Sequence, residues 1–359
     1  MRICSTVAVW NRHVLFAAGL ILIAIVILFW WNATDQNLYG LASSYQTFVT
    51  IFLGIFIEAL PFLLLGTVAS GLVEVFLSRE TLSRVVPHNR FGSVISGALM
   101  GLAFPVCECG VVPLTRRLYR KGLPLSVGVA FLLAAPIINP IVIASTYAAF
   151  GWSPVFVGRF AFALLIATAT GLIFSLAPQP LDLLERSAWP ESCNSKQDEA
   201  ATEAESADAG DTPKPVASRH ASLSVRLTRA LSVAGDEFFE MGRFLVIGCL
   251  LAAGMQTIVP QSILLAVGGG ALSSVVAMLV LAFVLSVCST VDAFLALAFV
   301  NTFSSGSILA FLVFGPMVDV KSVIMFSSVF RRRVVLYLVL LPLMMSLFLG
   351  AYLNTNVGW

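Results

Sequence analysis

The feature that most constrains the fold of this chain is a set of long, continuous apolar runs. They lie at residues 14–31, 48–77, 151–177 and 334–353. An α-helix needs about 20 apolar residues to cross a bilayer, and these runs reach or approach that length. Composition agrees, because 58% of the 359 residues are hydrophobic and 11% are charged. The sequence therefore predicts an all-α polytopic membrane protein rather than a β-barrel, whose strands alternate over about 10 residues.

The first apolar run, 14–31, predicts an extra transmembrane helix at the N-terminus. It follows Arg2 and Arg12, as the apolar part of a signal peptide would, but no small-x-small cleavage site comes after it. The run ends in a pair of tryptophans at Trp31, which is typical of a membrane interface. We expect residues 1–44 to form a retained helix and a periplasmic loop.

One long hydrophilic segment divides the rest of the chain. Residues 179–230 are rich in Ser, Ala, Asp and Glu, with nine acidic and two basic residues between Leu181 and Asp211. Such a segment cannot bury enough apolar surface to fold alone. We expect a disordered acidic cytoplasmic linker between a first membrane half at 45–178 and a second at 231–359.

The two halves share a pattern that predicts an internal duplication. The matching residues are an apolar triplet, a proline and a polar residue: Ala130 to Leu132, Pro136 and Asn139 and, 180 residues later, Ala310 to Leu312, Pro316 and Asp319. Upstream, Cys107 falls opposite Cys288 and Glu58 opposite Glu240, at offsets of 181 and 182. Because these uncommon residue types recur in the same order, we expect two repeats.

The basic residues predict a hairpin in the first half. Arginine and lysine concentrate on the cytoplasmic side of membrane proteins. Two basic clusters, within 79–90 and 116–121, flank a short apolar piece at 91–106. If that piece crossed the membrane once, the second cluster would lie outside, whereas a hairpin that turns at 107–110 keeps both clusters inside.

The same rule predicts opposite orientations for the two halves. It places the N-terminus in the cytoplasm and the C-terminus in the periplasm, and the second-half hairpin, 263–300, then opens to the outside. We therefore expect two inverted repeats, each with a re-entrant or broken helical hairpin. This plan recurs among secondary transporters, whose substrate site lies between the repeats.

The turn of the first hairpin carries the candidate metal ligands. Pro105 and Pro113 remove helical hydrogen bonds, which is tolerated at membrane depth only inside protein or beside water. In an extended turn, residues i and i+2 point the same way, so we expect Cys107 and Cys109 to offer two sulfurs to one ion, with Cys288 as the third. Thiolates favour Cu(I), Zn(II) and, by the same softness argument, trivalent arsenic. Two small residues at a tight turn, or a reversible disulfide, are the alternatives.

Polar side chains at the same predicted depth extend this site into a candidate ion pathway. They are Glu58, Glu108, Asn139, Asp292 and Asp319. Acids inside a membrane are costly and mark ion pathways or proton relays by default. Asn139 and Asp319 have interhelical hydrogen bonding as their alternative role. Glu237 and Glu240 lie near helix ends, where snorkelling to the interface is the simpler role.

Several classes of function are not indicated. The formal net charge of +2 is too small to suggest nucleic acid, and a nucleotide-binding P-loop is absent. An enzyme would need a nucleophile beside an activating base, and the histidines, His13, His88 and His220, all fall outside the predicted membrane depth. We expect no enzymatic activity and no cofactor, with transport energised by an ion gradient or by the substrate's own gradient.

Four stretches of the sequence resemble a known family. They are FPVCECGVVPLTRRLYRKGLP at 104–124, AFLLAAPIINPIVIASTYAAF at 130–150, CSTVDAF at 288–294 and AFLVFGPMVDVK at 310–321. Together they resemble the bacterial predicted-permease family that contains organoarsenical efflux permeases and a branch of copper/zinc efflux transporters. The resemblance covers nearly all of the chain after the first helix.

This resemblance implies a multi-pass protein of the bacterial inner membrane that exports a thiophilic ion. Glu108 between two cysteines is similar to the copper/zinc branch, and a mixed sulfur and carboxylate site suits a cation. Efflux of arsenite or methylated arsenicals is the second reading, and a membrane dithiol redox protein is the third. The linker departs from a metal-buffering loop, because it has His220 but no run of histidines. The expected partners are the transported ion and the lipid bilayer, and a homo-oligomer is compatible with the sequence.

Overall fold

A computed structural model of the chain describes residues 38–77, 82, 87, 89–104, 106–176, 184, 223–258 and 270–356. The predicted first helix and most of the predicted linker lie outside these residues. Within them the chain is helical and contains no strand, only an isolated bridge between Leu184 and Phe330. The prediction of an all-α membrane protein is confirmed.

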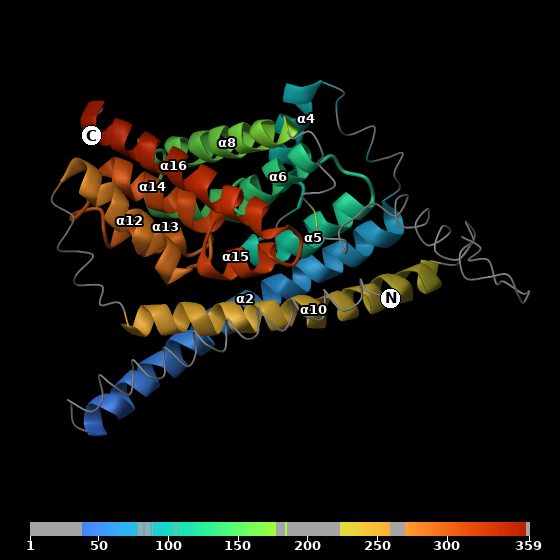
Figure 1. Cartoon of the computed structure of the whole chain (residues 1–359), viewed down its shortest axis with the longest axis horizontal. Coiled ribbons are helices and arrows are strands. Elements are labelled where there is room, and N and C mark those ends of the chain that lie inside the picture. Colours follow the sequence, from blue (N-terminus) through green and yellow to red (C-terminus); the bar gives the residue numbers. More distant parts are fainter. Residues whose placement is uncertain are drawn as a thin grey trace, which may run out of the picture.

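The described helices fall into two sets, one in each half of the chain. In the first half they are α2 (Leu38–Phe76), α4 (Arg90–Leu99) with its 3-10 extension η1 (Met100–Leu102), α5 (Glu108–Arg120), α6 (Leu125–Ala134), α7 (Pro140–Phe150) and α8 (Pro154–Ser175). In the second half they are α10 (Leu223–Ile258), α12 (Ala271–Leu285), α13 (Asp292–Leu297), α14 (Ser305–Met317), α15 (Val320–Phe326) and α16 (Arg332–Asn356). Figure 1 shows α2 and α10 crossing beside a body made of the other helices.

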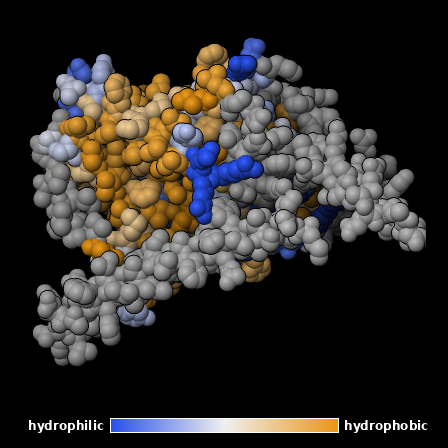
Figure 2. All heavy atoms as spheres, viewed as in Figure 1, coloured by the Kyte–Doolittle hydropathy of each residue, from blue (hydrophilic) through white to orange (hydrophobic). Residues whose placement is uncertain are grey.

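Five helical segments of the described chain are long and apolar enough to cross a membrane. They are Ser44–Phe76, Pro154–Ser175, Leu227–Ile258, Ser305–Phe326 and Arg332–Asn356. Protein buries 83% of the most apolar 18-residue window within Ser305–Phe326 but only 11% of the corresponding window within Ser44–Phe76. The segment formed by α14 and α15 is therefore central, and α2 is peripheral. Figure 2 shows a broad apolar surface on the helical body, as contact with lipid requires.

Close contacts show which ends of several helices lie side by side. Gly171, near the end of α8, lies against Ser126 near the start of α6 and against Ala130 in its middle. Gly158, near the start of α8, lies against Leu309 near the start of α14. The starts of α6 and α14 therefore lie beside opposite ends of α8, while the inverted duplication stays a prediction.

The pieces on either side of the predicted turn form a hairpin. Gly97 of α4 lies against Val127 of α6, and Gly101 of η1 lies against Ala135 just after α6, so α4 and α6 run in the same direction. A short loop joins the end of α5 to the start of α6. The start of α4 and the end of α5 consequently lie toward the same side of the molecule.

The second half of α5 is held to α2 and α10 by ion pairs. Arg116 Nη1 lies 2.8 Å from Glu240 Oε1, and Arg117 Nε lies 3.3 Å from Glu237 Oε2. Glu237 is buried and also accepts a 2.6 Å hydrogen bond from Ser70 Oγ of α2. The prediction that Glu237 snorkels is therefore wrong, because α10 begins well before this residue and carries it into the contact with α5.

A close backbone approach between α2 and α5 positions the start of α5. A Cβ atom at Gly66 of α2 would collide with the backbone of Gly110. Glycine at both positions lets α2 and α5 touch, as small residues do at helix interfaces in membranes. Because Gly110 follows Glu108 by two residues, this contact fixes the place of the candidate site.

The hairpin leads to a topology prediction. A reporter fused after Arg120 should be cytoplasmic, because the basic clusters at both ends of the hairpin stay inside. A reporter fused at the C-terminus should be periplasmic, because the same rule places that end of the chain outside. Alkaline phosphatase and green fluorescent protein fusions measure the two locations. A periplasmic signal after Arg120 would contradict both the hairpin and the inverted arrangement.

Candidate functional site

The first hairpin turns just before α5 rather than within the Cys-Glu-Cys-Gly stretch. Cys107 is the N-cap of α5, with an extended backbone (φ −84, ψ −178), and Glu108 is the first helical residue. The amides of Gly110 and Val111 both donate to the Cys107 carbonyl, at 3.0 and 2.9 Å. The expected extended turn, with Cys107 and Cys109 on one side of a strand-like segment, is therefore wrong, because Cys109 already belongs to the helix.

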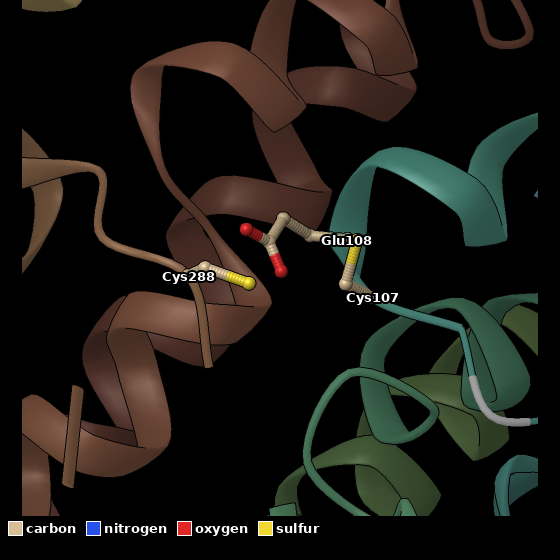
Figure 3. Close-up of side chains that lie close together, drawn as sticks. All are labelled: Cys107, Glu108 and Cys288. Atoms are coloured by element: carbon tan, nitrogen blue, oxygen red, sulfur yellow. The ribbon is translucent and has the colours of Figure 1, made fainter. Parts of the chain in front are cut away.

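The structure instead brings together Cys107, Glu108 and Cys288. One ligand atom from each lies within 4.8 Å of the other two, and all three residues are buried. Figure 3 shows the Cys288 side chain pointing from its loop toward the Glu108 carboxylate, with Cys107 at the start of α5. Two thiols and a carboxylate, drawn from both halves of the chain, thus form a potential three-ligand metal site.

Cys288 reaches this position because α12 stops early. Ser286, which follows the last residue of α12, adopts a left-handed conformation with φ of 48°. The chain is then non-helical until α13 begins at Asp292. This release from the helix lets the Cys288 side chain leave α12 and face α5.

The other two described cysteines in the neighbourhood are not in the three-ligand group. Cys109 is buried, and its thiol interacts with that of Cys107. Cys249 is fully buried in α10, as expected for a small apolar residue. Both residues therefore serve as controls for the three-ligand group.

Lys321 of α15 is a charged residue of the site that the sequence analysis missed. Its ammonium group is buried and donates a 2.6 Å hydrogen bond to the Ser286 carbonyl. Its Nζ also lies 3.4 Å from Asp319 Oδ2 and 3.7 Å from Glu108 Oε1. A lysine inside the apolar stretch that continues to Phe330 was a usable signal, since intramembrane charges are rare and need a partner.

Asn139 and Asp319 occupy equivalent places at the breaks between paired helices. Asn139 caps α7, because its Oδ1 accepts a 2.9 Å hydrogen bond from the Ile141 amide. Asp319 caps α15, because its Oδ1 accepts a 2.6 Å bond from the Ser322 amide. Asn139 Nδ2 also donates to the carbonyl of Val106 at 3.3 Å. Asn139 thus holds the residue immediately before Cys107, and a pathway role for the pair stays a prediction.

Asp292 is neutralised by a cation that the sequence analysis also missed. Arg159 of α8 is fully buried and its Nη2 lies 2.6 Å from Asp292 Oδ2. The same guanidinium donates to Thr146 Oγ1 at 3.0 Å and to the Ser289 carbonyl at 3.4 Å. Arg159 therefore anchors both ends of the short segment that follows Cys288.

Glu58 lies on α2, where it faces the same region. It is partly buried and interacts electrostatically with Cys288 and Lys321. Several side-chain oxygens around the site are buried without a hydrogen-bond partner among the described residues: Glu58 Oε1, Glu108 Oε2, Ser289 Oγ and Asp292 Oδ1. Each such atom costs about 1–3 kcal/mol if it stays unsatisfied, so their concentration here points to water or an ion.

Comparisons with known proteins agree with a membrane transport role. The profile of the ArsP_1 family, described as a predicted permease, matches residues 44–355, which include every candidate site residue. The UPF0718 protein YcgR of Bacillus subtilis is 45% identical over 299 residues, 83% of this chain and 93% of that protein. A putative two-component membrane permease complex subunit of Streptococcus mutans is 36% identical over 301 residues, 83% of this chain and 92% of that protein. No solved structure matches.

Proposed function

Because this chain belongs to the predicted permease family, we propose that it exports copper or zinc across the bacterial inner membrane. The observation that carries the proposal is the buried group of Cys107, Glu108 and Cys288, whose ligand atoms lie within 4.8 Å of one another. Thiolates select Cu(I) and Zn(II) over harder cations. The metal is the transported substrate rather than a resident cofactor.

The spacing of the ligand atoms supports a metal of this size. Two sulfurs bound tetrahedrally at about 2.3 Å from Zn(II) lie about 3.8 Å apart, so the three groups need only small side-chain movements to close on an ion. Sites that keep an open fourth position exchange their ligand, whereas structural zinc sites are closed by four protein ligands. A three-ligand site therefore suits an ion that must be bound and then released.

An arsenical is the alternative substrate, and one observation favours it. The Cys107 thiol interacts with the thiols of both Cys109 and Cys288, which would give a soft trivalent arsenic three sulfurs. Glu108 argues for the metal cation, because a carboxylate adds negative charge that neutral arsenite does not need. A dithiol redox role of Cys107 and Cys109 is the third alternative.

A second subunit belongs to the proposed partners. The Streptococcus mutans relative is named as a subunit of a two-component membrane permease complex. We extend that arrangement to this chain, beside the lipid bilayer and the transported ion. Proton exchange through Glu58 and the acids near the site is the proposed source of energy, because acids at membrane depth commonly form relays.

Transport into everted inner-membrane vesicles tests the proposal. Vesicles that contain the protein should accumulate Cu(I) or Zn(II), and Glu108→Gln should lower the initial rate at least tenfold, because the neutral amide is a much poorer metal ligand. Glu240→Gln is the matched control, since this carboxylate pairs with Arg116 away from the metal group. Metal uptake is measured with a radioactive or fluorescent tracer at equal protein level.

Two results would change the assignment. Accumulation of arsenite or a methylated arsenical without either metal would favour the alternative substrate. Vesicles that hold the folded protein but accumulate none of these substrates would contradict the proposal.

A further inference from the structure

Two acids, Glu108 and Asp292, are the first residues of α5 and α13, and each meets a cation from the other half of the chain. Glu108 of α5 lies 3.7 Å from Lys321 of α15, and Asp292 of α13 lies 2.6 Å from Arg159 of α8. The two pairs differ in strength. The Arg159 pair is hydrogen-bonded, whereas Glu108 Oε2 is buried without a hydrogen-bond partner among the described residues.

Lys321 has other partners that would stabilise its ammonium group if the contact with Glu108 were lost. Its ammonium group is 2.6 Å from the Ser286 carbonyl and 3.4 Å from Asp319 Oδ2. These two oxygens are nearer than the Glu108 carboxylate, so the ammonium can leave Glu108 while it keeps its closest contacts.

The backbone at Lys321 is fixed while the side chain is long. A Cβ atom at Gly248 of α10 would lie 3.0 Å from Lys321 Cα, so α15 packs tightly on α10 at this point. The four-carbon stem of lysine carries a compact point charge on several rotatable bonds. A small rotation of this stem changes the distance from the ammonium to Glu108 without a movement of either helix.

We propose that Lys321 is a tethered cation that competes with the transported metal for Glu108. This inference rests on the proposed function, because it concerns the same three-ligand group. When a metal ion binds Cys107, Glu108 and Cys288, the ammonium gives up its 3.7 Å contact with Glu108 and keeps those with Asp319 and the Ser286 carbonyl; when the ion leaves, the contact with Glu108 forms again. Lys321 stays positively charged throughout and acts through Glu108, so it is a positioning residue that sets affinity and release.

The proposal makes the effect of Lys321 depend on the charge of the ligand. The permanent positive charge of Lys321, several ångströms from the bound ligand, repels a divalent ion twice as strongly as a monovalent ion. It does not repel a neutral molecule. Removal of the charge in Lys321→Met should therefore tighten Ag(I) binding about tenfold, tighten Zn(II) binding about a hundredfold and leave arsenite binding unchanged. Ag(I) serves here as a redox-stable probe for Cu(I).

The test measures dissociation constants of the full-length protein in detergent, by competition with a chelator for Zn(II) and Ag(I) and by calorimetry for arsenite. Lys321→Arg should restore the wild-type values, because it keeps the charge. Arg116→Met is the matched control, since it removes a cation from an ion pair with Glu240 away from the metal group. In vesicles, Lys321→Met should lower the maximal transport rate together with the metal concentration at half-maximal rate, because release becomes slow.

The outcomes separate this inference from the function on which it rests. If Lys321→Met bound Zn(II) with unchanged or weaker affinity, the competition by charge would be overturned. The same would follow if its affinity rose equally for Zn(II) and Ag(I). If the wild-type protein bound neither metal, the proposed metal site itself would be refuted.

Discussion

Arg159→Met should destabilise the protein by about 3–5 kcal/mol, which is the cost of removing one partner from a buried ion pair. Arg159 is fully buried, and its guanidinium is 2.6 Å from Asp292 and also bonds Thr146 and the Ser289 carbonyl. Methionine fills a similar volume but leaves the Asp292 carboxylate without its cation. We expect a large fall in the melting temperature of the protein in detergent, and a lower level in the membrane.

Two further variants separate the lost ion pair from lost packing. The double variant Arg159→Met with Asp292→Leu should recover much of the stability, because a well-packed apolar pair often replaces a buried ion pair without loss. Arg116→Met should cost about 1 kcal/mol or less, because its partner Glu240 is partly exposed, with 38% of its side chain accessible. A melting temperature of Arg159→Met equal to that of the wild type would contradict a structural role for the pair.

The long helices are the part of the fold that the sequence predicts well, because each depends on local composition. The run at 151–177 becomes α8 at Pro154–Ser175, and the run at 334–353 becomes α16 at Arg332–Asn356. The helix expected at about 45–77 becomes α2, which begins earlier, at Leu38. Apolar length alone decides whether a segment can cross a bilayer, so the tertiary structure adds little to these assignments.

The start of α5 shows where local reasoning stops. Prolines and a glycine around Cys107 predict a turn, and a turn is present, but the helix resumes at Glu108. The approach of Gly66 to Gly110 holds α5 at this depth, and this contact joins two helices that are distant in the sequence. The sequence therefore identifies Cys107 and Cys288 as neighbours through the repeat pattern, but it does not show that Glu108 replaces Cys109 beside them.

The two buried cations show a different limit. Arg159 and Lys321 each lie within an apolar stretch, and an intramembrane cation is a signal that the sequence contains. The sequence does not show which acid pairs with each cation, since Arg159 and Asp292 are 133 residues apart. Which acid neutralises which cation depends on how the two halves pack, and periodicity and composition carry no information on that.

Cys107→Ser and Cys288→Ser should each abolish metal transport and weaken Zn(II) binding by more than about 100-fold. Loss of a residue that only orients a ligand already costs about 10–100-fold in affinity, so loss of a ligand should cost more. A serine hydroxyl keeps the shape and hydrogen bonding of the side chain but lacks the thiolate that soft ions select. Equilibrium metal titration of the purified variants and uptake into everted vesicles measure the two effects.

Serine substitution at the other buried cysteines decides which sulfurs bind. Cys249→Ser should lower stability by about 1–3 kcal/mol, since it buries a hydroxyl in α10, and should leave metal affinity unchanged. Cys109→Ser should also keep Zn(II) affinity within a few-fold of the wild type, because the ligand atoms of Cys107, Glu108 and Cys288 form the group without it. If Cys109→Ser abolished metal binding while Glu108→Gln did not, the ligands would be three sulfurs rather than two sulfurs and a carboxylate. That set suits trivalent arsenic as well as a metal cation, so the substrate assignment would then move with the ligand assignment.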